Sequence, residues 1–154
     1  MVARIQNLYL LLAGLLAIAS IFLPFWSFNT GHLFLICDFV SSETAEVQYS
    51  IGSYASGIFS VVTALASFTA IFFFKNRALQ SKLILLAIVL FALDLLSGLT
   101  AAHFLNQYFE SLHKAVTHNP EAGMYILLPE PVLLWLALKG VKKDDKIANA
   151  YKRL

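Results

Sequence analysis

Two carboxylates within otherwise apolar runs are the residues in this sequence best suited to chemistry. The first, Asp94, lies eleven residues into the apolar run that starts at Leu83. At helical rise that distance is about 16 Å, which is near the middle of a bilayer. A charge at that depth costs about 2.5–3.5 kcal/mol on insertion scales and indicates a function by default. Asp94 therefore predicts a proton or cation relay, a polar anchor for a partner helix, or a carboxyl group that only hydrogen-bonds within the bundle.

Glu130 stands between two prolines, Pro129 and Pro131. In transporters, carboxylates at broken membrane helices couple an ion to transport, and this spacing is compatible with such a role. The simpler interpretation is a carboxylate that water reaches near the end of a short helix. We favour the simpler interpretation for Glu130.

A stripe of hydroxyl side chains precedes Asp94 in the chain. Its members recur at spacings of three and four, which places them on one face of a helix: Ser53, Ser56, Ser60, Thr63 and Ser67. Asp94 shares its own helical face with the small residues Ala87, Gly98 and Ala101. Small residues let membrane helices approach closely, and hydroxyls hydrogen-bond between helices. We therefore expect the hydroxyl stripe, Asp94 and Gly98 to form an internal polar seam.

The spacing of the residues gives little indication of a metal site or a catalytic site. The candidate metal ligands are scattered: His32, His103, His113, His118, Cys37 and Glu121. No pair of them has the spacing that makes a zinc site recognisable. GxSxG, HExxH and phosphate-binding glycine loops are absent from the sequence, and a single cysteine excludes an internal disulfide. We expect no metal, no cofactor and no enzymatic activity.

The elements that position these residues are membrane helices. Of the 154 residues, 59% are hydrophobic and 13% are charged, whereas soluble domains have about 25% charged residues. Four apolar runs predict an all-α integral membrane domain with spans at about 8–28, 51–74, 83–104 and 124–138, followed by a tail at 139–154. A cleaved signal peptide ending near Ala17-Ile18-Ala19 is the alternative for the first run. The apolar run continues past this triplet, so we favour a retained helix.

The sequences between and after the apolar runs also predict local structure. Residues 29–50 predict a small hairpin with strands at Leu33–Ile36 and Glu46–Ser50, packed on the mouth of the bundle. The two prolines predict an irregular start to the last span, with regular helix from Pro131. The tail is expected to continue as an interfacial helix.

Positive charge is confined to three regions. All eleven Lys and Arg residues except Lys114 lie at the N-terminus, in the link that carries Lys75, Arg77 and Lys82, or from Lys139 onward, where Lys142 and Lys143 lie. With four spans, these regions share one side, and the positive-inside rule predicts that both termini are cytoplasmic. A net charge of +2 is too small to suggest nucleic acid as a partner. The basic tail is suited to anionic lipid.

Three motifs resemble one known family. They are Arg4-Ile5-Gln6 with the apolar run after it, the link Phe74-Lys75-Asn76-Arg77, and the segment from Ala137 to Asp145 that follows Pro131. Together they resemble the domain of unknown function 4293 family, four-helix inner-membrane proteins of Bacteroidetes. The resemblance implies a four-helix architecture in a bacterial inner membrane, without an established activity. It implies no role for Asp94 or for the outer loops.

For function, we expect a small accessory or structural subunit of a larger membrane assembly, in contact with lipids and other integral subunits. The small size of the chain and the lack of a recognisable reaction centre favour this interpretation. The alternative is a small proton-coupled transporter, or a channel-like homo-oligomer, that uses Asp94. Water access to Asp94 distinguishes the two, because a dry, hydrogen-bonded Asp94 indicates a structural role.

Overall fold

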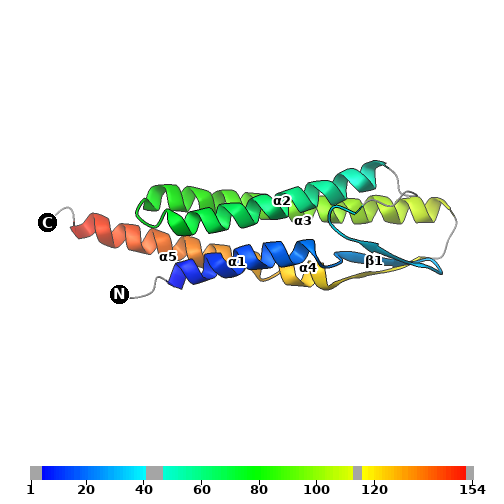
Figure 1. Cartoon of the computed structure of the whole chain (residues 1–154), viewed down its shortest axis with the longest axis horizontal. Coiled ribbons are helices and arrows are strands. Elements are labelled where there is room, and N and C mark those ends of the chain that lie inside the picture. The colour runs from blue at the N-terminus through cyan, green and yellow to red at the C-terminus, as the bar shows by residue number, and fades with distance from the viewer. Residues whose placement is uncertain (1–4, 41–46, 113–115, 152–154) are drawn as a thin grey trace.

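The computed structural model describes residues 5–40, 47–112 and 116–151 of the chain. They form an elongated bundle of helices with a small sheet at one end (Figure 1). The element order is α1 (Ile5–Ile21), β1 (Trp26–Asn29), β2 (Leu33–Ile36), α2 (Val47–Phe72), α3 (Arg77–Ser111), β3 (Thr117–Pro120), α4 (Ala122–Leu127) and α5 (Glu130–Tyr151).

Three segments are long and apolar enough to cross a membrane: Tyr49–Phe72, Arg77–Ser111 and Ala122–Ala148. Helix α1 is apolar too, but its 17 residues extend only about 26 Å, less than the roughly 30 Å of a hydrocarbon core. Large apolar side chains lie exposed on the outside of these helices, for example Leu15, Leu65, Val89 and Val132. Such a surface suits lipid rather than water, so the fold is that of a membrane protein.

The first predicted span, 8–28, is wrong at its end. Helix α1 ends at Ile21, and residues Trp26–Asn29 form strand β1 instead. Pro24 explains the difference, because proline disfavours helical conformation in the residue before it and cannot donate a backbone hydrogen bond.

The predicted hairpin is half correct. Leu33–Ile36 is a strand, but it pairs antiparallel with β1, and residues 47–50 open helix α2. The loop between β1 and β2 turns at Gly31, whose φ of 96° is a left-handed conformation that glycine adopts freely. Residues 41–45, between the two predicted strands, lie outside the described residues.

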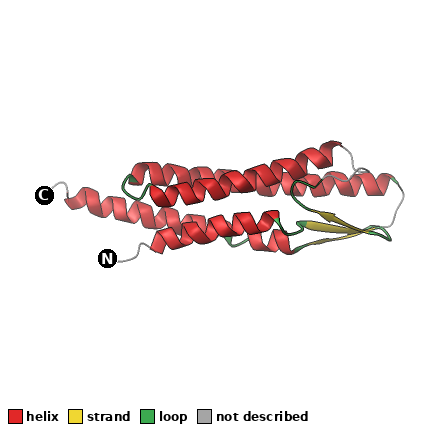
Figure 2. Cartoon of the chain, in the orientation of Figure 1, coloured by secondary structure: helices red, strands yellow, loops and turns green. Residues whose placement is uncertain are grey.

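A third strand, β3, completes the sheet in the order β2-β1-β3. It pairs antiparallel with β1, so that Trp26 lies opposite Pro120 on one side and Ile36 on the other. Two strands alone are marginal, and the third strand with packing on α3 stabilises them. Phe28 of β1 lies 5.8 Å from Phe109 of α3 between ring centroids, so the sheet lies against the distal part of α3 (Figure 2).

The remaining boundaries follow capping and proline chemistry. Asn76 accepts a hydrogen bond from the backbone N–H of Leu79 and starts α3, which runs past the predicted end at 104 to Ser111. The last span is broken at Leu128 and Pro129, as the prolines predict, and α5 then begins at Glu130. The tail is helical as expected, because α5 continues without interruption to Tyr151.

The start of α1, the link from α2 to α3 and the end of α5 lie together at the end of the bundle opposite the sheet (Figure 1). This arrangement places the link lysines and the α5 lysines at the same end. Arg4, Lys114, Lys152 and Arg153 are outside the described residues. Inside the bundle, α2 packs against α1 and α3, and α5 packs against α1 and α3.

Candidate functional site

Asp94 lies at the centre of a buried polar cluster. Its side chain is 2% exposed. The hydroxyl of Ser56 donates to Asp94 Oδ1 and the hydroxyl of Ser60 donates to Asp94 Oδ2, both at 2.6 Å. These two serines are one helical turn apart on α2, so one carboxyl group joins α2 to α3 through two hydrogen bonds.

Helix α1 reaches the same cluster through Ser20. The Ser20 and Ser60 hydroxyl oxygens are 3.5 Å apart, and the Ser20 hydroxyl donates to the carbonyl of Ala17 at 2.8 Å. A serine hydroxyl has only one proton to donate. Since Ser60 donates to Asp94 and Ser20 donates to Ala17, the contact between the two serines is a close approach of α1 to α2 rather than a strong bond.

Glu130 is a second buried acid, so the interpretation that water reaches it near the end of a short helix is wrong. It is 1% exposed, and neither of its carboxyl oxygens has a hydrogen-bond partner among the described residues. It lies close enough to Asp94 for the charge of one to act on the other. Glu130 is the first residue of α5, and Pro131 offers it no backbone N–H. An unpartnered buried carboxyl group destabilises the fold, which makes Glu130 the least satisfied group of the site.

Asp38 is the third acid, and it comes from the loop after β2. Burial, and then the nearby charge of Asp94, raise the pKa of the Asp38 carboxyl to about 7, although the neighbouring Ser56 side chain acts in the opposite direction. Asp38 is partly exposed, unlike Asp94. Asp94 therefore interacts electrostatically with two other acids, the partly exposed Asp38 and the buried Glu130.

The loop that carries Asp38 is clamped onto α2. The hydroxyl of Ser53 donates to the carbonyl of Cys37 at 2.7 Å. The ring of Phe39 covers Gly57 so closely that a Cβ on that glycine would lie 2.5 Å from a ring carbon. Phe39 has a φ of 59°, which is an uncommon conformation for a bulky residue. The packing of the Phe39 ring on Gly57 offsets the energetic cost of this backbone conformation. It also holds Asp38 beside the pair of helices α2 and α3.

The predicted polar seam divides into three parts. Ser53 bonds the loop, Ser56 and Ser60 bond Asp94, and Thr63 and Ser67 are buried with no partner for their hydroxyl oxygens among the described residues. Gly98 lies under the ring of Phe25, where a Cβ would be 3.0 Å from a ring carbon.

The sequence did not single out Asp38 as a member of the site, nor Ser20 or Phe25. Ser20 carried a weak signal, because it is a polar residue at the end of an apolar helix. Asp38 carried no such signal, since an acid in a loop is ordinarily solvated.

The candidate metal ligands remain dispersed. Among the residues that the structure describes, no three His, Cys, Asp or Glu side chains could together hold a metal ion. His32 and His103 are exposed, and His118 lies 6.0 Å from the ring of Trp26. His113 lies outside the described residues.

The basic residues lie at the other end of the bundle. Lys75 and Lys82 are exposed, as are Lys142 and Lys143. Arg77 differs from them, because its guanidinium donates to the carbonyl of Asp144 at 2.6 Å and so ties the α2–α3 link to α5.

A family model described as Domain of unknown function (DUF4293) matches residues 2–154. Neither a curated protein nor a solved structure matches the chain.

Proposed function

The chain belongs to the family described as Domain of unknown function (DUF4293), and we propose that it serves as a small accessory subunit of a larger membrane protein assembly. In this proposal it resides in the bacterial inner membrane with both termini cytoplasmic. Its helices are apolar enough for a membrane location, and positive charge favours the cytoplasmic side.

The observation that carries the proposal is a groove between α2 and α3. Its volume is about 350 Å³, and it is lined by Ile51, Gly52, Ala55, Ser97, Thr100 and Phe104. Beside it the two helices pack closely, because a Cβ on Gly52 would lie 2.8 Å from the Cβ of Ala101. Grooves lined by small residues are where membrane helices pack against one another.

The hydroxyl groups in this groove are already satisfied. Ser97 donates to the carbonyl of Leu93 at 2.9 Å, and Thr100 donates to the carbonyl of Leu96 at 2.6 Å. The groove therefore exposes mainly carbon atoms to its surroundings and presents few free hydrogen-bonding groups to water. The occupant that fits it is an apolar transmembrane helix of another integral subunit.

The closed geometry of Asp94 supports the same proposal. Both of its carboxyl oxygens accept hydrogen bonds, and the side chain is buried. A carboxyl group held in this way fixes α2 against α3, and the outer groove depends on that packing.

Native co-purification tests the proposal, with Ala55→Trp as the probe. Tryptophan at Ala55 fills the groove, whereas Ile58→Trp places the same side chain on an exposed site of the same helix. We expect a stoichiometric integral partner with the wild type and with Ile58→Trp, and its loss with Ala55→Trp. A monodisperse lone monomer, a homodimer, or lipid alone from native membranes would overturn the proposal.

A second candidate function is proton-coupled transport, as a monomer or a channel-like homo-oligomer, and the unpartnered Glu130 favours it. Ser56 donates to Asp94 and neighbours Asp38, and Asp94 acts electrostatically on both Asp38 and Glu130. Such a series of carboxyl groups leads from a partly exposed residue into the bundle. Asp94→Asn should abolish proton flux in liposomes while the protein remains folded. Flux that persists in this variant excludes the mechanism.

A further inference from the structure

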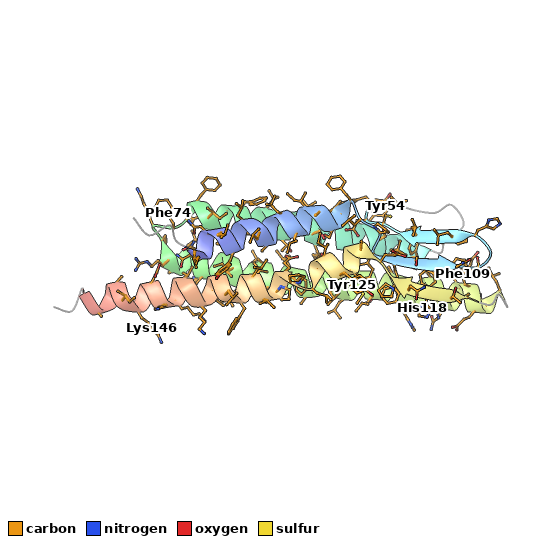
Figure 3. All side chains as sticks on the ribbon, turned by 90° about the horizontal axis from the view of Figure 1, so that it is seen from below. Tyr54, Phe74, Phe109, His118, Tyr125 and Lys146 are labelled. Atoms are coloured by element: carbon orange, nitrogen blue, oxygen red, sulfur yellow. The ribbon has the colours of Figure 1, made fainter. Side chains whose placement is uncertain are left out.

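A second groove lies on the outer face of α5, away from the buried acids. Its volume is about 490 Å³, and it is lined by Trp135, Leu138, Lys139, Lys142, Lys143 and Lys146. Lys146 projects from the outer side of α5, at the end of the bundle where Phe74 also lies (Figure 3). This is the end that holds the α2–α3 link.

Helical geometry gathers the four lysines on one side. Successive residues turn by about 100°, so positions 139, 142, 143 and 146 fall within an arc of roughly 100°. By the same count, Asp144 and Asp145 fall outside this arc. Asp144 also has partners on the other side of α5, because its Oδ2 accepts from Gln6 and its carbonyl accepts from Arg77. The groove face is therefore cationic, although the helix as a whole also carries acids.

The groove changes character along its length. Trp135 and Leu138 form its apolar part, nearer the start of α5, and the lysines after them extend toward the end of the helix. The ammonium of Lys139 lies 5.1 Å from the centre of the Trp135 ring, where the two parts meet. Tryptophan and lysine in this order mark the boundary between hydrocarbon and headgroups.

We propose that this groove binds the headgroup of an anionic phospholipid. The phosphate contacts the lysine side chains, and the part of an acyl chain nearest the headgroup lies along Trp135 and Leu138. The observation that selects a lipid over a soluble anion is the apolar part of the groove, which a free phosphate would leave uncovered. Each lysine near an anionic membrane surface strengthens binding about fivefold, so three of them supply about a hundredfold.

The inference stands apart from the proposed subunit role. The α5 groove and the α2–α3 groove share no residues. Failure of one proposal therefore leaves the other intact.

Quenching of tryptophan fluorescence tests the lipid site on the full chain. The sequence has two tryptophans, and Trp26→Phe leaves Trp135 as the reporter. In nanodiscs of phosphatidylcholine, brominated phosphatidylglycerol should quench Trp135 at a mole fraction about a hundredfold lower than brominated phosphatidylcholine. Equal quenching by the two lipids would overturn the proposal.

Lysine variants assign the effect to the groove. Lys142→Gln, Lys143→Gln and Lys146→Gln together should abolish the preference for phosphatidylglycerol. The matched control is Lys75→Gln with Lys82→Gln, which removes exposed charge at the same end but outside the groove. Loss of the preference in the control, or its retention in the groove variant, contradicts the assignment.

Native mass spectrometry of the unmodified chain supplies an independent readout, which does not depend on the folding of the Trp26 variant. One phosphatidylglycerol should remain bound to the wild type and not to the groove variant. Displacement by millimolar inorganic phosphate would show a site for free anions and would overturn the lipid assignment.

Discussion

The hydroxyl of Ser60 on α2 donates a 2.6 Å hydrogen bond to Oδ2 of Asp94 on α3, at the buried centre of the bundle. Ser56 makes the matching bond to the other carboxyl oxygen. Hydrogen bonds between membrane helices contribute about 0.6–2 kcal/mol each. Asp94 is therefore one residue with two contacts that fix the rotation of α3 relative to α2.

Asp94→Ala should lower the stability of the protein by about 1–3 kcal/mol, because two buried hydroxyls lose their acceptor. Thermal unfolding in detergent measures the loss. Ser97→Ala is the matched control, since the Ser97 hydroxyl donates to carbonyls of its own helix. The same Asp94 change in a background of Ser56→Ala and Ser60→Ala should cost much less, because coupled residues are not additive. Equal costs in the two backgrounds would show that the hydrogen bonds contribute nothing.

Glu130→Met should raise stability by about 1–3 kcal/mol, because it removes two buried oxygens without partners and keeps a similar volume. Glu110→Met, at an exposed position of α3, should have little effect. Chemical unfolding in mixed micelles gives both values. A destabilised Glu130 variant would mean that the carboxyl group holds a partner, such as a water molecule or an ion.

Stability should fall as the pH rises toward neutrality, through Asp38. Burial and the charge of Asp94 raise the pKa of Asp38 from 3.8 to about 7. The folded state holds the Asp38 proton more tightly than the unfolded state does. The contribution of this proton to the free energy of unfolding is therefore complete below about pH 3.8 and is lost as the pH rises to about 7. Asp94 from α3 and Ser56 from α2 face this group. Melting temperatures of the wild type and Asp38→Asn between pH 4.5 and 8 should therefore converge as the pH falls, or cross. A constant difference across this range contradicts the assignment.

Gly123→Ala should destabilise the protein by about 1–3 kcal/mol, because the new Cβ would lie 2.8 Å from the backbone oxygens of Leu23 and Pro24. Backbone cannot move aside there without disturbing the hydrogen bond from the Gly123 N–H to Pro24. Gly140→Ala is the control, since its Cβ would meet the Gln6 side chain, 3.0 Å from Oε1, rather than backbone oxygens at 2.8 Å, and alanine favours the helix. Melting temperatures should fall for Gly123→Ala and hold or rise for Gly140→Ala. The reverse order would refute the packing of α4 on the turn after α1.

Thiol labelling of intact cells should find the sheet outside and the link inside. In a Cys37→Ser background, a membrane-impermeant maleimide should label His32→Cys and leave Ala78→Cys unlabelled until the cells are lysed. Both positions are exposed in the fold, so burial does not explain a difference. Labelling of Ala78→Cys in intact cells would reverse the predicted orientation.

Much of the architecture was predictable because it depends on local properties. Apolar run length and charge position predict the helices, and the Pro129-Glu130-Pro131 segment predicts the break before α5. The hydroxyl stripe was predictable from helical periodicity. Strand β2 was predicted correctly, but its partner β1 was assigned to the first helix, because the apolar and aromatic residues on either side of Pro24 are compatible with a membrane helix as well as with a buried strand.

The sequence by itself determined that the chain is a helical membrane protein with acids at Asp94 and Glu130. Only the tertiary structure decided what those acids contact. Strand β3 pairs with β1 from 92 residues away along the chain, as the bond from Ser27 to Asn119 illustrates. The loop acid Asp38 meets Asp94 only because Ser53 and Gly57 hold that loop on α2. Periodicity fixes which face of a helix a residue occupies, but it does not fix which face of another helix lies opposite, since that is set by the packing of the whole bundle.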